Sequence, residues 1–154
     1  EIELNAAVFV NCVFKECDLS LAATRNTSFN DVTFEYCKIL AVRFDNCKKF
    51  LFEVTFKHCN CNHASFYLTS LKNTRFDTCK LQGVDFSDAD LTGVQFLDCE
   101  LLDAIFDNTN LEKSNFKSAQ NFRIDPNKNK LKKAVFSKNN LEGLLTEFGI
   151  QIVN

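Results

Sequence analysis

The sequence predicts an all-β fold, a four-sided β-helix of about seven coils that ends in a short C-terminal helix. Two observations carry this prediction: large apolar residues recur at every fifth position, and residues of the same type recur every 20 positions. A period of five fits neither an α-helix, with about 3.6 residues per turn, nor a flat strand, with a period of about two. It fits a chain that turns a corner every five residues and closes a square coil after four corners.

The five-residue period is clearest from residue 56 onward. A small or short residue stands two positions before each large one, as Val84 and Ala89 precede Phe86 and Leu91. Two residues of every five are therefore expected to point inward, while the polar residues between them face solvent. The large positions read Phe56, Cys61, Phe66, Leu71, Phe76, Leu81, Phe86, Leu91, Phe96, Leu101, Phe106, Leu111 and Phe116.

The 20-residue period indicates that equivalent side chains of successive coils, about 4.8 Å apart, stack in columns. The N-terminal register differs from the later one by two residues, which we interpret as a local bulge within Asn46–Leu51. Burial of each ring in a column contributes roughly 1.5–3 kcal/mol. With the shift allowed for, one column contains only phenylalanine: Phe14, Phe34, Phe56, Phe76, Phe96, Phe116 and Phe136.

Turn residues are scarce, since the chain has only 4 Gly and 1 Pro. Phenylalanine, by contrast, occurs 17 times. An all-β protein of this size normally uses more glycine and proline in its turns. Either the turns are made in another way, or one small turn is repeated many times.

Two stretches, Ala89–Gly93 (ADLTG) and Thr109–Lys113 (TNLEK), resemble the unit A(D/N)LXX of the pentapeptide repeat family. The resemblance covers roughly residues 2–121. It implies the fold that this family prefers, a right-handed quadrilateral β-helix. Residues 1–121 are accordingly expected to form the repeat domain, and residues 122–154 a loop, a last repeat, a helix and a strand.

The end of the chain has the pattern of a capped helix. Asn140 is the expected N-cap, Gly149 the expected C-terminal stop, and Ile150–Val153 a short strand. Such a segment either covers the open end of the last coil or packs against a second copy in a dimer. The expected helix places four apolar residues on one face: Leu141, Leu144, Leu145 and Phe148.

Residues Ala134–Val153 are similar to the tail of the bacterial quinolone-resistance pentapeptide proteins, the Qnr- and MfpA-like group. This resemblance implies a two-fold dimer through the tail. It also implies that the chain binds DNA gyrase or topoisomerase IV by imitating a DNA duplex and confers quinolone resistance. The alternative is a generic protein-binding scaffold of unknown partner.

Charge is uneven along the chain, although the net charge is only −2. Residues 113–154 hold eight bases and three acids, whereas residues 77–112 hold nine acids and one base, Lys80. This acidic band repels phosphate, so no direct binding of nucleic acid is expected, and no apolar run of about 18 residues predicts a membrane span. Spread over four faces, the band falls below the charge density of DNA on any one face. Its acids are Asp77, Asp85, Asp88, Asp90, Asp98, Glu100, Asp103, Asp107 and Glu112.

The cysteines and histidines do not predict a reactive site. Cys59 and Cys61 take inward positions whereas His58 and His63 take outward ones, so the four cannot close a tetrahedral zinc site. No metal, cofactor or enzymatic activity is expected, and a metal or thiol enzyme at residues 58–63 is the least favoured function. Reduced thiols acting as small apolar fillers fit a cytoplasmic protein. They form one column: Cys17, Cys37, Cys59, Cys79 and Cys99.

Overall fold

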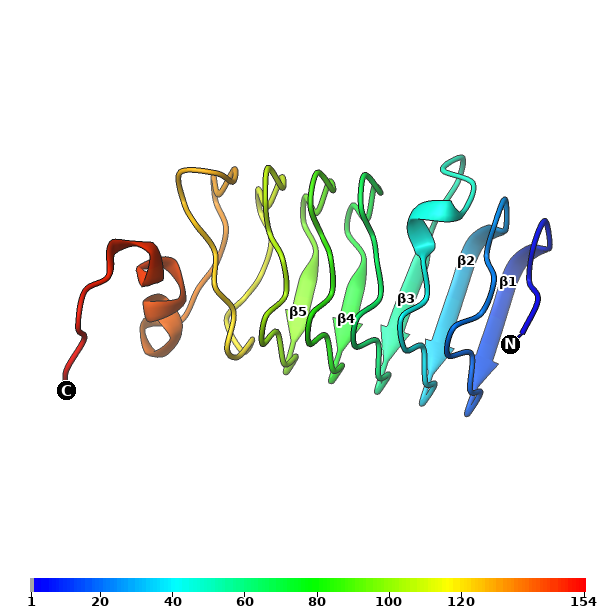
Figure 1. The fold of residues 1–154 in the computed structure, drawn as a ribbon, viewed down its shortest axis with the longest axis horizontal. Coiled ribbons are helices and arrows are strands. Elements are labelled where there is room, and N and C mark those ends of the chain that lie inside the picture. Colours follow the sequence, from blue (N-terminus) through cyan, green and yellow to red (C-terminus); the bar gives the residue numbers. More distant parts are fainter. Residues whose placement is uncertain (1) are drawn as a thin grey trace.

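The computed structural model describes residues 2–154 and has the shape of a rod. Five parallel strands lie side by side along its long axis in sequence order, with the N-terminus at one end and the C-terminal segment at the other (Figure 1). Each strand pairs with the next one in the chain, so successive coils stack directly. The strands are β1 (Val8–Lys15), β2 (Ser28–Glu35), β3 (Val54–Lys57), β4 (Arg75–Asp77) and β5 (Gln95–Leu97).

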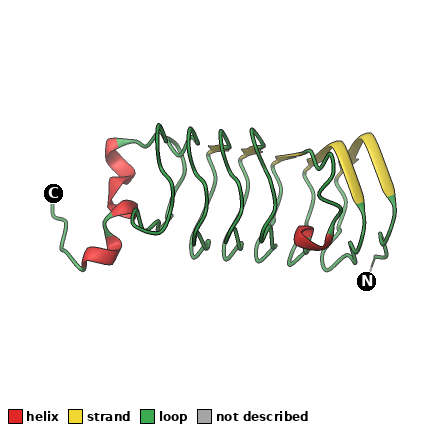
Figure 2. Ribbon diagram, turned by 90° about the horizontal axis from the view of Figure 1, so that it is seen from above, coloured by secondary structure: helices red, strands yellow, loops and turns green. Residues whose placement is uncertain are grey.

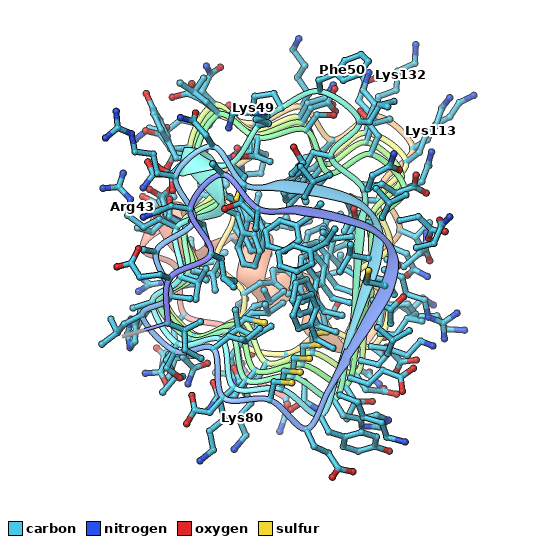
Figure 3. All side chains as sticks on the ribbon, turned by 90° about the vertical axis from the view of Figure 1, so that its right-hand side faces the viewer. Arg43, Lys49, Phe50, Lys80, Lys113 and Lys132 are labelled. Atoms are coloured by element: carbon cyan, nitrogen blue, oxygen red, sulfur yellow. The ribbon has the colours of Figure 1, made fainter. Side chains whose placement is uncertain are left out.

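Single β-bridges show that each coil has four sides. Viewed from the N-terminal end, the chain passes from Arg43 on the left to Lys49 at the top and recedes clockwise, so the coil is right-handed (Figure 3). This confirms the predicted four-sided β-helix. The bridges start five residues apart and join residues 20 positions apart: Lys80–Glu100, Asp85–Ile105, Asp90–Asn110 and Gln95–Asn115.

The regular sheet is shorter than the sequence predicts. Its five strands enclose about four turns, whereas about seven coils were expected. Beyond β5 the same side continues only as isolated bridges, from Gln95 to Asn115 and from Asn115 to Val135. Because a corner interrupts the extended backbone every five residues, one bridging residue per side is enough to keep the later coils stacked.

We number the sides by the large residue at their centre, and equivalent residues follow every 20 positions. Side 1 also contains strands β3 to β5. In the coil that begins on side 1 at β4, the centres are Phe76 (side 1), Leu81 (side 2), Phe86 (side 3) and Leu91 (side 4).

Most corners are tight turns whose third residue has positive φ. This left-handed conformation recurs every five residues, for example at His58 (φ 53°), His63 (60°) and Leu68 (52°). A backbone bond closes many of these turns, as from the N–H of Thr69 to the carbonyl of Phe66 (3.0 Å). One turn repeated with ordinary residues therefore replaces the missing glycines and prolines, at a cost of roughly 1–2 kcal/mol per corner.

Glycine occupies two corners where a side chain would have no room. A Cβ atom on Gly83 would lie 2.5 Å from Nδ1 of His63, and one on Gly93 would collide with the side-chain oxygen of Asn73. His63 and Asn73 are the equivalent corner residues one coil earlier. Their side chains lean along the axis, so the next corner must lack one.

Phenylalanine rings fill the rod in two stacked columns. Rings from Phe14 to Phe136 on side 1 follow one another at centroid separations of 4.8 to 5.4 Å. A second column on side 3 runs from Phe44 to Phe106 at 4.8 to 5.6 Å. The two columns meet edge to face, as Phe66 and Phe76 do at 5.9 Å and 81°, a geometry that aromatic pairs favour.

The change of register lies between Asn46 and Val54. Coils pair with an offset of 20 residues up to Asn46, of 22 residues where residues 54–65 meet the coil before them, and of 20 residues again in the later coils. A short 3-10 helix, η1 (Phe44–Asn46), precedes the bulge. Phe50 projects from it with 81% of its surface exposed (Figure 3). The bulge predicted within Asn46–Leu51 lies inside this segment.

The C-terminal segment is helical, but not in the predicted form. It consists of two 3-10 helices, η2 (Lys138–Leu144) and η3 (Thr146–Phe148), at the end of the rod (Figure 2). Gly149 ends them in the left-handed conformation (φ 60°), as predicted. The strand predicted at Ile150–Val153 is wrong, because this segment pairs with no other strand among residues 2–154. None of the helices in this range is long and apolar enough to cross a membrane.

Asn140 is not the N-cap of the terminal helix. Ser137 is, and its side chain accepts a hydrogen bond from the N–H of Asn139 (3.2 Å). The side-chain amide of Asn140 instead donates to the carbonyl oxygens of Phe116 (2.8 Å) and Ala119 (3.1 Å) in the last coil. Asn140 therefore satisfies backbone groups that the open end of the solenoid would leave unpaired.

Candidate functional site

The nine acidic residues predicted as a band are divided among all four sides of the rod. Each side presents two outward side chains and one corner side chain to solvent, so neighbours in sequence soon point in different directions. The structure therefore does not bring the nine together. Side 1 has Asp77 and Asp98, side 2 has Glu100 and, at its corner with side 3, Asp103, side 3 has Asp85, Asp88 and Asp107, and side 4 has Asp90 and Glu112.

Two of these acids, on sides 1 and 4, form ion pairs. Arg75 contacts Asp77 (2.8 Å), and Lys72 contacts Asp90 (3.3 Å). The hydrogen bond from Arg75 is the main reason why the pKa of Asp77 is lowered. On side 2, Lys80 occupies the position that bridges to Glu100. These acids contribute little unbalanced negative charge.

Side 3 differs, because over three successive coils it carries acids without bases. We call its surface over three coils, together with the corner that precedes it (residues 63–69, 83–89 and 103–109), the acidic face. These segments contain no lysine or arginine, and among residues 2–154 none of their acids has a basic nitrogen within 4.0 Å. The acids are Asp85 and Asp88 in one coil and Asp103 and Asp107, both exposed, in the next.

The acidic face also carries large apolar side chains, which the sequence analysis missed. Tyr67 is 40% exposed, Leu68 57% and Ile105 48%. All three occupy outward or corner positions of the repeat, where most residues are polar. Their register was therefore the signal that could have identified them.

The neighbouring side 4 is basic at both ends. Lys49 and Phe50 of the bulge lie at the top of the rod, on the same side as Lys132 of the last coil, with Lys113 near the next corner (Figure 3). Lys113 and Lys132 thus lie away from the unpaired acids, whereas Lys128 follows Asn108 in the next coil of side 3. Sides 3 and 4 give the rod two surfaces of opposite sign.

The histidines and cysteines of residues 58–63 lie where the repeat predicts. His58 is exposed and stacks on Tyr36 at 4.7 Å, whereas the thiol of Cys59 is buried and donates to the carbonyl of Phe34 (3.3 Å). Burial raises the pKa of Cys37 to about 11, which keeps this thiol protonated and unreactive. Among residues 2–154, no group of three or more His, Cys, Asp or Glu side chains could hold a metal ion.

The four residues expected on one face of the terminal helix have different surroundings. Leu144 packs against the core, and Leu145 lines a hollow of about 570 Å³ between the last coil and the tail. Leu141 and Phe148 are 41% and 59% exposed. They do not form a single stripe, because a 3-10 helix has about three residues per turn and rotates them apart.

Fold and surface together define a class of protein, a rigid parallel β-helix that presents fixed arrays of side chains. Residues 49–106 match the family model described as a pentapeptide repeat region. None of the curated proteins compared with the chain matches it.

Among solved structures, the chain is similar to QnrB1, a plasmid-mediated fluoroquinolone resistance protein. A trypsin-treated variant of QnrB1 matches with a TM-score of 0.75 and 20% identity, over 98% of this chain and 72% of that one. Full-length QnrB1 matches with a TM-score of 0.72 and 18% identity, over 96% and 73%. The chain thus contains a pentapeptide repeat region, and its fold is that of QnrB1.

Proposed function

We propose that this protein is a non-enzymatic interaction protein that binds a type II topoisomerase, DNA gyrase or topoisomerase IV, in place of DNA. By doing so it would confer quinolone resistance. The observation that carries the proposal is the acidic face, where four carboxylates lie on two successive coils without a basic partner. The fluoroquinolone resistance named for QnrB1, whose fold this chain shares, also supports it.

The charge density of the acidic face supports imitation of DNA over a short length. Two coils occupy about 10 Å of the axis, and a single strand of B-DNA carries about three charges over that distance. Asp85, Asp88, Asp103 and Asp107 supply four. Over these two coils the acidic face thus reaches the charge of one DNA strand, because the fold directs these acids to one side and its two corners.

A generic protein-binding scaffold is the second candidate. The acidic face is short, because in the coil before it side 3 carries Arg43 paired with Asp45 (2.7 Å). This short length favours the scaffold. A duplex mimic acting by charge alone would be expected to continue along the rod. The two candidates differ in whether a topoisomerase is the partner.

We further propose that the protein is a cytoplasmic homodimer that associates through its C-terminal segment. Apolar side chains of that segment remain exposed beyond the capped coil: Phe148 (59%), Ile150 (57%) and Ile152 (52%). Such a patch at the end of a rod is typical of an interface. The free thiols of all eight cysteines fit a reducing compartment.

A supercoiling assay with purified gyrase tests the proposal. The unaltered protein should slow supercoiling alone and relieve inhibition by a quinolone. The variant D85N/D88N/D103N/D107N should lose both effects, because it removes the unpaired charge while keeping the size of each side chain.

The matched control removes four charges from other sides, as D77N/D98N/E100Q/E112Q. It should retain most of both effects. If the unaltered protein neither slows gyrase nor relieves the drug, the topoisomerase proposal fails and the scaffold remains. If the two variants behave alike, net charge matters and side 3 does not.

A further inference from the structure

The acidic face combines charge with apolar surface in a way that a purely electrostatic mimic does not need. Tyr67 and Leu68 lie on the coil before the first unpaired acids, and Ile105 lies on the coil that carries Asp103 and Asp107. Outward positions of this β-helix are mostly polar, and about half of the surface of Tyr67, Leu68 and Ile105 stays in contact with solvent. Their presence calls for a contact outside the chain.

Ile105 lies among the acids. It bridges to Asp85 of the preceding coil, and Asp103 and Asp107 stand two residues away on either side. Its side chain is 48% exposed. An aliphatic side chain ringed by three carboxylates has the arrangement of an interface centre with a polar rim.

Tyr67 and Leu68 form a second apolar spot, two coils from Ile105 and therefore about 10 Å along the axis. Tyr67 offers a rigid ring with a hydroxyl at its edge, the kind of side chain that dominates protein interfaces. Both spots lie on the acidic face, which has no lysine or arginine. A partner that covers the acids must therefore also cover the apolar residues.

We propose that Tyr67, Leu68 and Ile105 are the anchors of the acidic face, and that they fit a basic protein surface with apolar recesses. This inference rests on the proposed function and specifies the chemistry of the topoisomerase surface involved. The carboxylates steer and orient the partner, whereas the anchors supply contacts that salt does not screen. The same face would then discriminate a folded protein from a simple polycation, which offers charge alone.

The test is the affinity of purified gyrase for the protein, measured at low and at moderate salt. The variant Y67S/I105S should bind at least about tenfold more weakly, by the same factor at both salt concentrations, since it removes apolar contacts without changing charge. D85N/D88N/D103N/D107N should instead flatten the dependence on salt. The control V13S/V135S truncates two valines of side 1, 62% and 47% exposed, and should bind like the unaltered protein.

The outcomes separate the two proposals. If gyrase binds no form of the protein, the proposed function fails and the anchors fail with it. If gyrase binds the unaltered protein and Y67S/I105S equally well, the proposed function stands and the anchors are overturned. Thermal unfolding of each variant shows whether a loss of binding reflects a loss of fold, and all the substituted positions are outward or corner ones.

Discussion

At the scale of single residues, the rod depends on side chains enclosed by copies of themselves. Phe76 has no exposed surface. It stacks between Phe56 (5.0 Å) and Phe96 (5.4 Å) and meets Phe66 (5.9 Å) and Phe86 (6.1 Å) edge to face. Four rings around a fifth leave no room for relaxation, so a smaller side chain must leave a cavity.

Replacing Phe76 by alanine should lower the free energy of unfolding by about 3–5 kcal/mol, because it removes a buried ring and leaves its volume empty. Phe50→Ala is the matched control. It deletes the same atoms from a side chain that is 81% exposed, and should change stability by less than about 0.5 kcal/mol. Denaturant unfolding of both variants checks this. Equal midpoints for Phe76→Ala and the unaltered protein would show that the column does not stabilise the rod.

The spacing predicts inward residues well, because the direction of a side chain depends only on its place in the repeat. The spacing alone predicts that Phe76 points inward, without any knowledge of the neighbouring coils. Asn140 shows where such reasoning stops. An asparagine before a leucine-rich run has the local pattern of an N-cap, but its partners are the free carbonyls of Phe116 and Ala119, more than 20 residues earlier.

At the scale of elements, the regular coils were predictable and the irregular ones only in part. The bulge follows from a change of register that can be read in the sequence, and the structure places it before Val54. The type of the terminal helix does not follow from apolar spacing. Its buried residue is Gly143, on which a Cβ atom would collide with Phe122. Contact with the last coil therefore decides how the segment packs.

The proposed dimer is testable at this scale with Phe148, which is 59% exposed. Phe148→Asp should give monomers by light scattering where the unaltered protein gives dimers, because the carboxylate would be buried in the interface without a partner. Phe50→Asp places the same charge on the bulge and should leave the dimer intact. Leu145 is a poorer probe, because it lines the hollow beside the last coil. A monomeric unaltered protein would mean that the segment only caps the rod.

At the scale of the whole molecule, the distribution of charge between sides matters more than its distribution along the sequence. The sequence predicts an acidic band over residues 77–112 and, with four faces, a charge density below that of DNA. The structure shows where this charge is concentrated, although four charges over two coils remain below the roughly six of a DNA duplex. Arg75, Lys72 and Lys80 accompany acids on the other sides, so the unbalanced charge is concentrated on the acidic face.

The acidic face could have been predicted by assigning every charged residue to a side, since the five-residue register is sufficient for that. The ion pairs could not, because they depend on the reach of each side chain across a coil. The outward positions of Tyr67 and Ile105 could have been predicted by the same assignment of residues to sides. Their partner surface lies outside this chain, and only the combination of exposure and neighbouring acids indicates what it must be.

The central claim, that the acidic face takes the place of DNA, is tested most directly by competition. A fluorescently labelled DNA duplex bound to purified gyrase should be released, with falling anisotropy, as the unaltered protein is added. D85N/D88N/D103N/D107N should release far less DNA at the same concentration, and D77N/D98N/E100Q/E112Q should release nearly as much as the unaltered protein. A complex that holds the protein and the DNA together, or equal release by the first variant and the unaltered protein, would contradict the claim.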